Sequence, residues 1–161
     1  MMRSAQLAAT LAALVALASI SVAAGCGESP GPAPNEAPWA DRLMFDAVAA
    51  PVLEEQCANP TCHGGPWRPL ALYAPRLYRM DPADVHLDGP LNDDEQTANF
   101  ERVRGFLLDV TSPERCLLVT KPLSQASGGV FHGGGSQYED SGERGYQALV
   151  SWVRTCLEGR L

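Results

Sequence analysis

Apolar residues recur with a helical period near the carboxyl-terminal end of the chain. Their spacing of three and four positions places them on one face of a helix, which is typical of an amphipathic helix packed on a core. Ser141 is expected to cap the start of this helix, and Gly159 to follow its end. The apolar stripe consists of Tyr146, Leu149, Val150, Trp152, Val153, Cys156 and Leu157.

A second amphipathic helix is predicted to start at Asp41 and to lead into Cys57. Its apolar residues again follow helical spacing, but Pro51 lies inside the segment. Because proline lacks a backbone N–H, it kinks a helix or occupies the first turn of a new one, so we expect a break between Ala49 and Pro51. The apolar positions are Phe45, Val48, Ala49, Val52 and Leu53.

The middle of the chain has weaker patterns. Residues 64–92 are rich in proline, glycine and aspartate without a sustained period, which predicts loops. Asn92 or Asp93 can cap a following helix, and Ser112-Pro113 can open another short one. No segment alternates as a strand does, so we predict an all-α domain whose long loops need a further group to pack against. The apolar side of the middle helix includes Phe100, Val103, Phe106 and Leu107.

The amino-terminal residues have the pattern of an export signal. Arg3 is followed by an alanine-rich apolar run from Leu7 to Val22, which is too short for a membrane span. The run ends in Val22-Ala23-Ala24-Gly25-Cys26, which resembles a bacterial lipobox. We therefore predict that residues 1–25 are a lipoprotein signal peptide and that Cys26 is acylated, with ordinary cleavage nearby as the alternative. Gly27 in place of aspartate implies an exported protein that is lipid-anchored at the outer membrane, on its periplasmic or cell-surface face.

The remaining composition separates a tether from one domain. Residues 26–40 contain four prolines and two glycines with few bulky apolar groups, which predicts a semi-extended tether. Residues 41–161 have the usual length of a single domain. The chain carries 12 Lys+Arg against 19 Asp+Glu, a net charge of −7. This acidic excess argues against a nucleic-acid partner and against charge-driven adhesion to anionic lipid.

The segment Cys57-Ala58-Asn59-Pro60-Thr61-Cys62-His63 carries the candidate chemistry. In c-type haem attachment two cysteine sulfurs add to the haem edge, and the histidine directly after the second cysteine binds iron. The common spacing has two intervening residues, whereas this chain has four. Positions five apart on a regular helix point about 140° apart, so both sulfurs can reach one ring only if the helix is interrupted. Asn59-Pro60 supplies the expected turn.

Further residues extend this motif over most of Phe45 to Gly159. They are Pro51-Val52-Leu53, Cys62-His63-Gly64-Gly65, Leu70-Ala71-Leu72, Ser112-Pro113, Leu117-Leu118, Lys121-Pro122-Leu123, His132-Gly133-Gly134-Gly135, Tyr146, Leu149 and Trp152-Val153. Together these segments resemble the small cytochrome c-like domains found in many bacterial lipoproteins.

The resemblance implies one covalent haem c, attached through Cys57 and Cys62, with iron bound by His63. His132 stands where the family places the second axial ligand, so bis-histidine ligation is expected. The implied function is a membrane-anchored electron carrier rather than an enzyme, working with a redox partner protein. Apolar side chains are expected to enclose the ring, namely Phe45, Leu70, Leu72, Phe131, Tyr146 and Trp152.

Several alternatives remain open. Cys57 and Cys62 can instead form a local disulfide, which would make the chain a haem-free surface lipoprotein acting as a binding or interaction module. His132 can be a plain loop residue, with His86 as the reserve ligand, and peroxidase activity would require an open sixth position. Met80 and Met44 fit the ligand position less well.

The last two cysteines are predicted to pair with each other. Cys156 lies on the buried stripe of the last helix, and Cys116 lies in a short apolar segment. A disulfide between them would restrict the unfolded chain by roughly 3 to 4 kcal/mol in the entropy account.

Overall fold

The computed structural model of the chain describes residues 40–159. The described residues all belong to one compact unit, residues 37–161. The predicted signal peptide, the acylated Cys26 and nearly all of the predicted tether lie outside the described residues.

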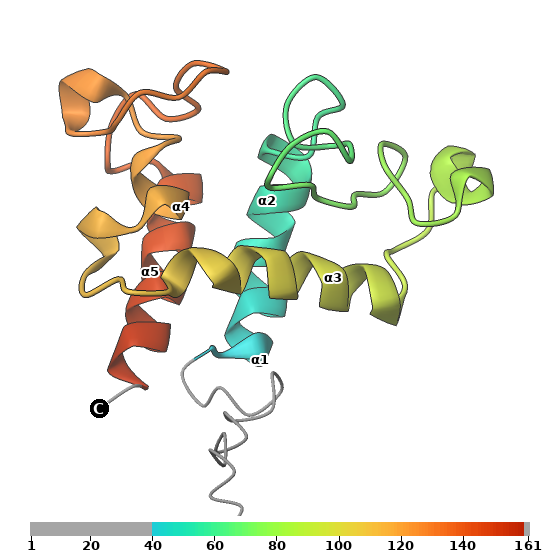
Figure 1. Ribbon diagram of the computed structural model, residues 1–161, viewed down its shortest axis with the longest axis horizontal. Coiled ribbons are helices and arrows are strands. Elements are labelled where there is room, and N and C mark those ends of the chain that lie inside the picture. Colours follow the sequence, from blue (N-terminus) through green and yellow to red (C-terminus); the bar gives the residue numbers. More distant parts are fainter. Residues whose placement is uncertain (1–39, 160–161) are drawn as a thin grey trace, which may run out of the picture. The chain divides into compact units, whose positions relative to one another are not determined.

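The described part is all-α, as predicted (Figure 1). Within residues 40–159 the backbone forms no strand, and only two isolated bridges occur, between Ala74 and Tyr78 and between Leu123 and Tyr138. None of the helices in this range is long and apolar enough to cross a lipid bilayer.

The first helical segment changes type where proline was expected to interrupt it. It comprises α1 (Arg42–Met44), the π-helix η2 (Phe45–Ala49) and α2 (Ala50–Gln56). The Asp41 side chain caps the start by accepting a hydrogen bond from the Met44 N–H at 2.8 Å. Pro51 lies in the first turn of α2, where its missing N–H costs nothing, as predicted. The expected break is absent, because the backbone stays helical from Arg42 to Gln56 and only changes from π to α at Ala50.

A long loop leads from α2 to the middle helix. Its only helical turn among the described residues is the 3-10 helix η3 (Pro82–His86), and α3 (Asp93–Arg104) follows. Asn92 caps α3 as predicted, and Glu95 completes a reciprocal capping box. A 3-10 turn, η4 (Gly105–Leu107), extends α3 and brings Leu107 into the core.

The second half of the domain consists of short turns and one long helix. These are the 3-10 turn η5 (Pro113–Arg115), α4 (Leu117–Thr120), the 3-10 turn η6 (Gln125–Ser127) and α5 (Arg144–Glu158). The prediction that Ser141 caps α5 is wrong, because α5 begins at Arg144 and its N-cap position is Glu143. The Ser141 carbonyl instead accepts a hydrogen bond from the Gln147 side chain at 2.5 Å. Gly159 follows the helix end, as predicted.

The core is centred on the apolar stripe of α5. Trp152 is fully buried, packs edge-to-face against Phe45 at 5.2 Å between ring centres, and donates its indole N–H to the Asp41 carbonyl at 3.0 Å. Phe45 also meets Phe100 of α3 at 5.3 Å. These rings join α5, η2 and α3, which Figure 1 shows as two helical segments side by side with α3 crossing them.

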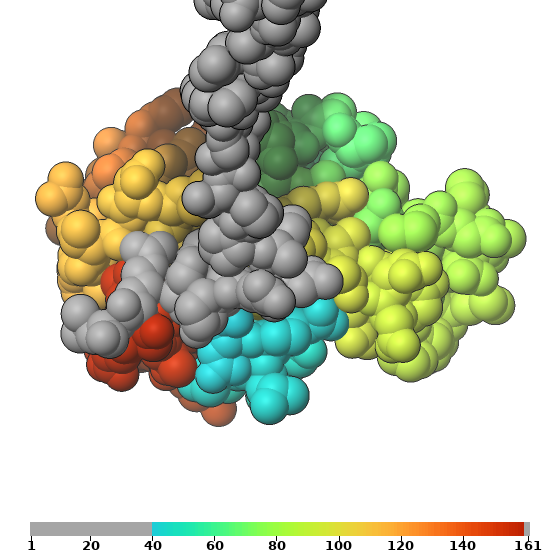
Figure 2. Space-filling view, turned by 60° about the horizontal axis from the view of Figure 1, so that its bottom comes forward, coloured from blue at the N-terminus to red at the C-terminus, as the bar shows by residue number. Residues whose placement is uncertain are grey.

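A buried ion pair fastens the long loop onto α3. The Arg79 and Glu95 side chains are 5% and 0% exposed and meet at 2.9 Å. The segment around η3 projects from one side of the domain, coloured yellow-green in Figure 2. The Arg79 guanidinium also donates to the carbonyls of Gly89 and Pro90. Arg79 precedes η3 and these two residues follow it, so the residues on both sides of η3 are linked to α3.

Candidate functional site: a histidine pair at the loop end

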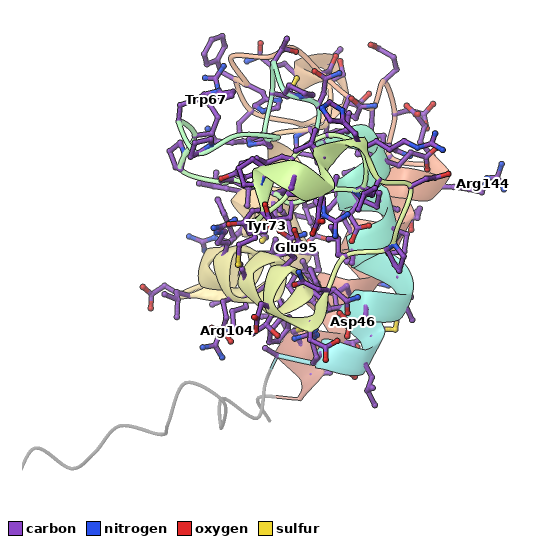
Figure 3. All side chains as sticks on the ribbon, turned by 90° about the vertical axis from the view of Figure 1, so that its right-hand side faces the viewer. Asp46, Trp67, Tyr73, Glu95, Arg104 and Arg144 are labelled. Atoms are coloured by element: carbon purple, nitrogen blue, oxygen red, sulfur yellow. The ribbon has the colours of Figure 1, made fainter. Side chains whose placement is uncertain are left out.

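Two loops lie at the same end of the domain, at the top of Figure 1. One follows α2 and covers residues 57–72, and the other follows α4 and covers residues 121–136. We refer to these two loops together as the loop end. Trp67 marks its outer edge in Figure 3 and is 65% exposed.

The segment from Cys57 to His63 forms a compact turn. The Asn59 carbonyl accepts hydrogen bonds from the N–H groups of Cys62 and Gly64, and the Cys57 carbonyl accepts one from the His63 N–H at 3.1 Å. The Asn59 side chain also accepts from the Thr61 N–H at 2.9 Å. The expected turn between Cys57 and Cys62 is therefore present, and it brings His63 back to the end of α2.

Gly64 permits this turn because the backbone passes very close to itself. A β-carbon at position 64 would lie 2.1 Å from the Ala58 carbonyl oxygen, which is part of the backbone and cannot move aside cheaply. The close approach explains why glycine follows His63 here.

The second loop presents His132 by a similar close approach. A β-carbon at Gly129 would lie 1.9 Å from the Leu123 carbonyl oxygen, and the next residue, Val130, donates its N–H to the Thr120 carbonyl at 3.0 Å. Gly135 then donates to the His132 carbonyl at 2.9 Å, closing a tight turn around the histidine.

The two imidazole rings lie together. The ring centres of His63 and His132 are 5.9 Å apart, and their planes differ by only 9°. The structure therefore brings together two residues that are 69 positions apart in the sequence and that were both predicted to bind one metal.

Hydrogen bonds fix the tautomer of both rings. His63 Nδ1 is 2.8 Å from the Leu70 carbonyl oxygen, and His132 Nδ1 is 2.8 Å from the Gly135 carbonyl oxygen. A carbonyl oxygen only accepts, so each Nδ1 carries the proton and each Nε2 keeps a free lone pair. This arrangement of Nδ1 bonded to a carbonyl with Nε2 available is the usual one for a metal-binding histidine.

The electrostatic surroundings keep His63 neutral. Burial lowers the pKa of His63 below its ordinary value, and the nearby charges of His132, Arg68 and Lys121 lower it further, against the opposing effect of the Leu70 hydrogen bond. A neutral imidazole is the form that binds metal, so His63 is competent as a ligand at neutral pH.

The spacing of the paired rings is close to that of two imidazoles sharing one ion. Imidazole nitrogens bind transition metals at about 2 Å, so two such rings have their centres about 6 Å apart, and those of His63 and His132 are 5.9 Å apart. The two rings are stacked here, so binding one ion together would require them to turn until their Nε2 atoms face each other. Within residues 40–159 no group of three or more histidine, cysteine or acidic side chains is arranged to hold a metal by itself.

The two cysteines of the Cys57–His63 segment lie beside the pair. Cys57 and Cys62 are both partly exposed and are not joined to each other. Burial raises the pKa of Cys57 to about 11, and the neighbouring Cys62 contributes. Tyr138 also lies near Cys57, and its buried hydroxyl donates to the Gln56 side chain at 2.8 Å.

The apolar side chains expected around a ring are mostly buried. Phe45, Leu70, Leu72, Tyr146 and Trp152 are all part of the core. Phe131 is not part of this core, since its side chain is 75% exposed, and its contact with a haem stays a prediction. Its loop follows the glycines at 128 and 129, and it lines an open cavity of about 320 Å³ beside His132 instead of entering the core.

The reserve ligands lie elsewhere in the domain. His86 is exposed on η3, and Met80 is 46% exposed at the start of the same projection. The Met80 N–H donates to Glu95 at 2.7 Å, which fixes this residue next to α3.

Cys116 and Cys156 both lie in the hydrophobic core. The structure does not join them, and the Cys116 thiol donates to the Phe106 carbonyl at 3.5 Å. Burial also raises the pKa of the Cys116 thiol. Their disulfide stays a prediction.

Comparison with known proteins identifies no family for the chain. No family model matches the chain, and no curated protein and no solved structure matches it.

Proposed function

We propose that the chain is a membrane-anchored c-type cytochrome-like protein that binds one haem and transfers electrons. The single observation that carries this proposal is the His63–His132 pair, whose parallel rings are 5.9 Å apart with both Nδ1 atoms held by backbone carbonyls. The proposal includes a cytochrome c-like arrangement of the helices around the loop end.

Each residue of the site has a distinct role in this proposal. Cys57 and Cys62 would hold the haem covalently, and His63 and His132 would bind its iron. The haem supplies a centre that accepts and releases one electron. The carbonyls of Leu70 and Gly135 orient the two imidazoles, and the surrounding core keeps water away from one side of the site.

Export and anchoring belong to the same proposal and rest on the sequence. Cys26 would carry the lipid, and residues 26–40 would tether the domain to the outer membrane. Replacing Cys26 by alanine should abolish incorporation of labelled fatty acid and release the protein into the soluble periplasmic fraction.

Pigment formation tests the central claim. The full chain, expressed with cytochrome c maturation proteins, should have a Soret band and keep its haem after denaturation. Cys57→Ser with Cys62→Ser should remove this covalent haem. A colourless product with Cys57 and Cys62 joined in a disulfide would contradict the proposal and favour a haem-free interaction module.

The second ligand is tested by comparing two histidines. His132→Ala should convert the spectrum of a six-coordinate low-spin haem into that of a five-coordinate or water-bound one, whereas the exposed His86→Ala should leave the spectrum unchanged. His132→Met should raise the reduction potential, because thioether sulfur favours reduced iron. An unchanged spectrum and potential in both His132 variants would remove His132 from the site.

A further inference from the structure

The loop end differs in charge from the rest of this acidic chain. The sequence has 19 acidic residues, yet none occurs between Cys57 and Met80 or between Cys116 and Tyr138. The two loops that carry the histidine pair therefore contribute no carboxylate side chain of their own.

Four cationic residues lie in these two stretches, and two of them have acidic partners. Arg76 pairs with Asp88, and Arg79 pairs with Glu95. For the other two, Arg68 and Lys121, the described residues provide no ion pair. Lys121 is also the only lysine of the chain.

Arg68 and Lys121 lie beside the histidine pair. Arg68 donates to the carbonyl of Thr61, inside the attachment motif, at 3.4 Å. Lys121 lines the cavity of about 320 Å³ that His132 also lines, together with polar groups of Ser124, Gln125 and Ser136. Both cations are close enough to act on the charge of His63. One uncompensated cation thus comes from each loop.

We propose that Arg68 and Lys121 bind the two propionate carboxylates of the haem, one cation from each loop of the loop end. This inference rests on the proposed function. Haem carries two carboxylates, which in a c-type site need positive partners or water, and no other pair of cations in the two loops is uncompensated. The two loops themselves contribute no carboxylate that would compete with the propionates for these cations.

Chemical modification of the single lysine tests the proposal directly. The haem-loaded chain and the haem-free chain, expressed without maturation proteins, are treated with an acylating reagent, and peptide mass spectrometry follows Lys121. Acylation should slow by roughly tenfold when haem is present, because an ammonium group that gains an anionic partner has less reactive free amine. Equal rates in the two forms would overturn the proposal for Lys121.

Reduction potentials test both cations. Lys121→Gln and Arg68→Gln should each lower the potential of the haem-loaded chain, because positive charge beside the site favours the reduced form. Lys121→Arg, which keeps the positive charge, should have the reduction potential of the unchanged chain. Arg76→Gln is the matched control, since Arg76 is exposed and already paired, and it should leave the potential unchanged.

The outcomes separate this inference from the proposed function. A normal Soret band with potentials in Lys121→Gln and Arg68→Gln equal to that of Arg76→Gln would refute the propionate assignment and leave the haem site standing. A full chain without pigment would refute both.

Discussion

Replacing Glu95 by alanine is expected to destabilise the folded chain by about 3 to 5 kcal/mol, because it leaves a buried guanidinium without its counter-charge. The Glu95 carboxylate accepts from Arg79 Nε at 3.0 Å and Nη2 at 2.9 Å, and from the N–H groups of Met80 at 2.7 Å and Asn92 at 3.0 Å. Alanine removes all of these acceptors at once, and the Arg79 side chain, 5% exposed, cannot turn to water.

Urea unfolding followed by circular dichroism measures this loss. A domain of this size has about 5 to 15 kcal/mol of stability, so the midpoint should fall markedly, and Glu95→Gln provides a milder variant that keeps the side-chain size. Glu101→Ala is the matched control, because Glu101 lies on the same helix, is 35% exposed and pairs with Arg104. Exposed pairs contribute less than about 1 kcal/mol. Glu95→Ala within about 1 kcal/mol of Glu101→Ala would refute the reasoning.

The same pair predicts a pH dependence. Burial alone would raise the pKa of Glu95, but the hydrogen bonds from Arg79, Met80 and Asn92 hold it below its ordinary value. The stabilisation from Glu95 is therefore complete above the unfolded pKa of about 4.3 and is lost as the pH falls below it through the lower folded value. Glu95→Gln should reduce the loss of unfolding free energy as the pH falls below about 4.3. The same loss in the variant and in the unchanged chain would contradict this prediction.

Three further predictions concern the loops and the cysteines. Gly129→Ala should destabilise the chain by about 1 to 3 kcal/mol and displace the loop that carries His132, because the new methyl group would lie 1.9 Å from the Leu123 carbonyl oxygen. Gly133→Ala, where a methyl group has open space, should be nearly neutral, and similar urea midpoints for the two variants would count against this prediction. In the reduced haem-free chain at pH 8, iodoacetamide should modify Cys57 slowly, because with a pKa of about 11 only about one thiol in a thousand is ionised. Urea should speed the reaction by exposing the thiol, and equal rates with and without urea would argue against its burial. Non-reducing mass mapping of exported protein should find Cys116 joined to Cys156, and two free thiols there would end that prediction.

Periodic patterns along the chain predicted the helices well. The stripe of α5 was recognisable because helix packing repeats on every turn, and the Asn92 cap because a capping box has a fixed spacing. The position of Pro51 in the first turn of α2 followed from its missing N–H, but the π-helix Phe45–Ala49 before it did not, since no residue type in the sequence marks a turn with one extra residue. Ser141 failed as a cap because several polar residues precede α5 and the pattern does not say which one begins it.

Side-chain motifs predicted which residues form the candidate site, but not what orients them. Both imidazoles are held by backbone carbonyls, at Leu70 and Gly135. Because every residue has a backbone carbonyl, the residue types at these two positions do not reveal that their carbonyls accept from the histidines. The Arg79–Glu95 pair was missed for a related reason, since its members are 16 positions apart and only the folded loop joins them. The uncompensated cations could have been found by noting where acidic residues are lacking.

Each histidine of the pair is oriented from within its own loop. The acceptor for His63 is seven residues away along the same loop, and His132 and Gly135 bond to each other through both ring and backbone. Neither ring depends on a hydrogen bond from the opposite loop for its orientation. The orientation of His132 is therefore set within the segment from Lys121 to Ser136, and a change of the side chain at position 132 would leave the hydrogen bond that orients His63 in place.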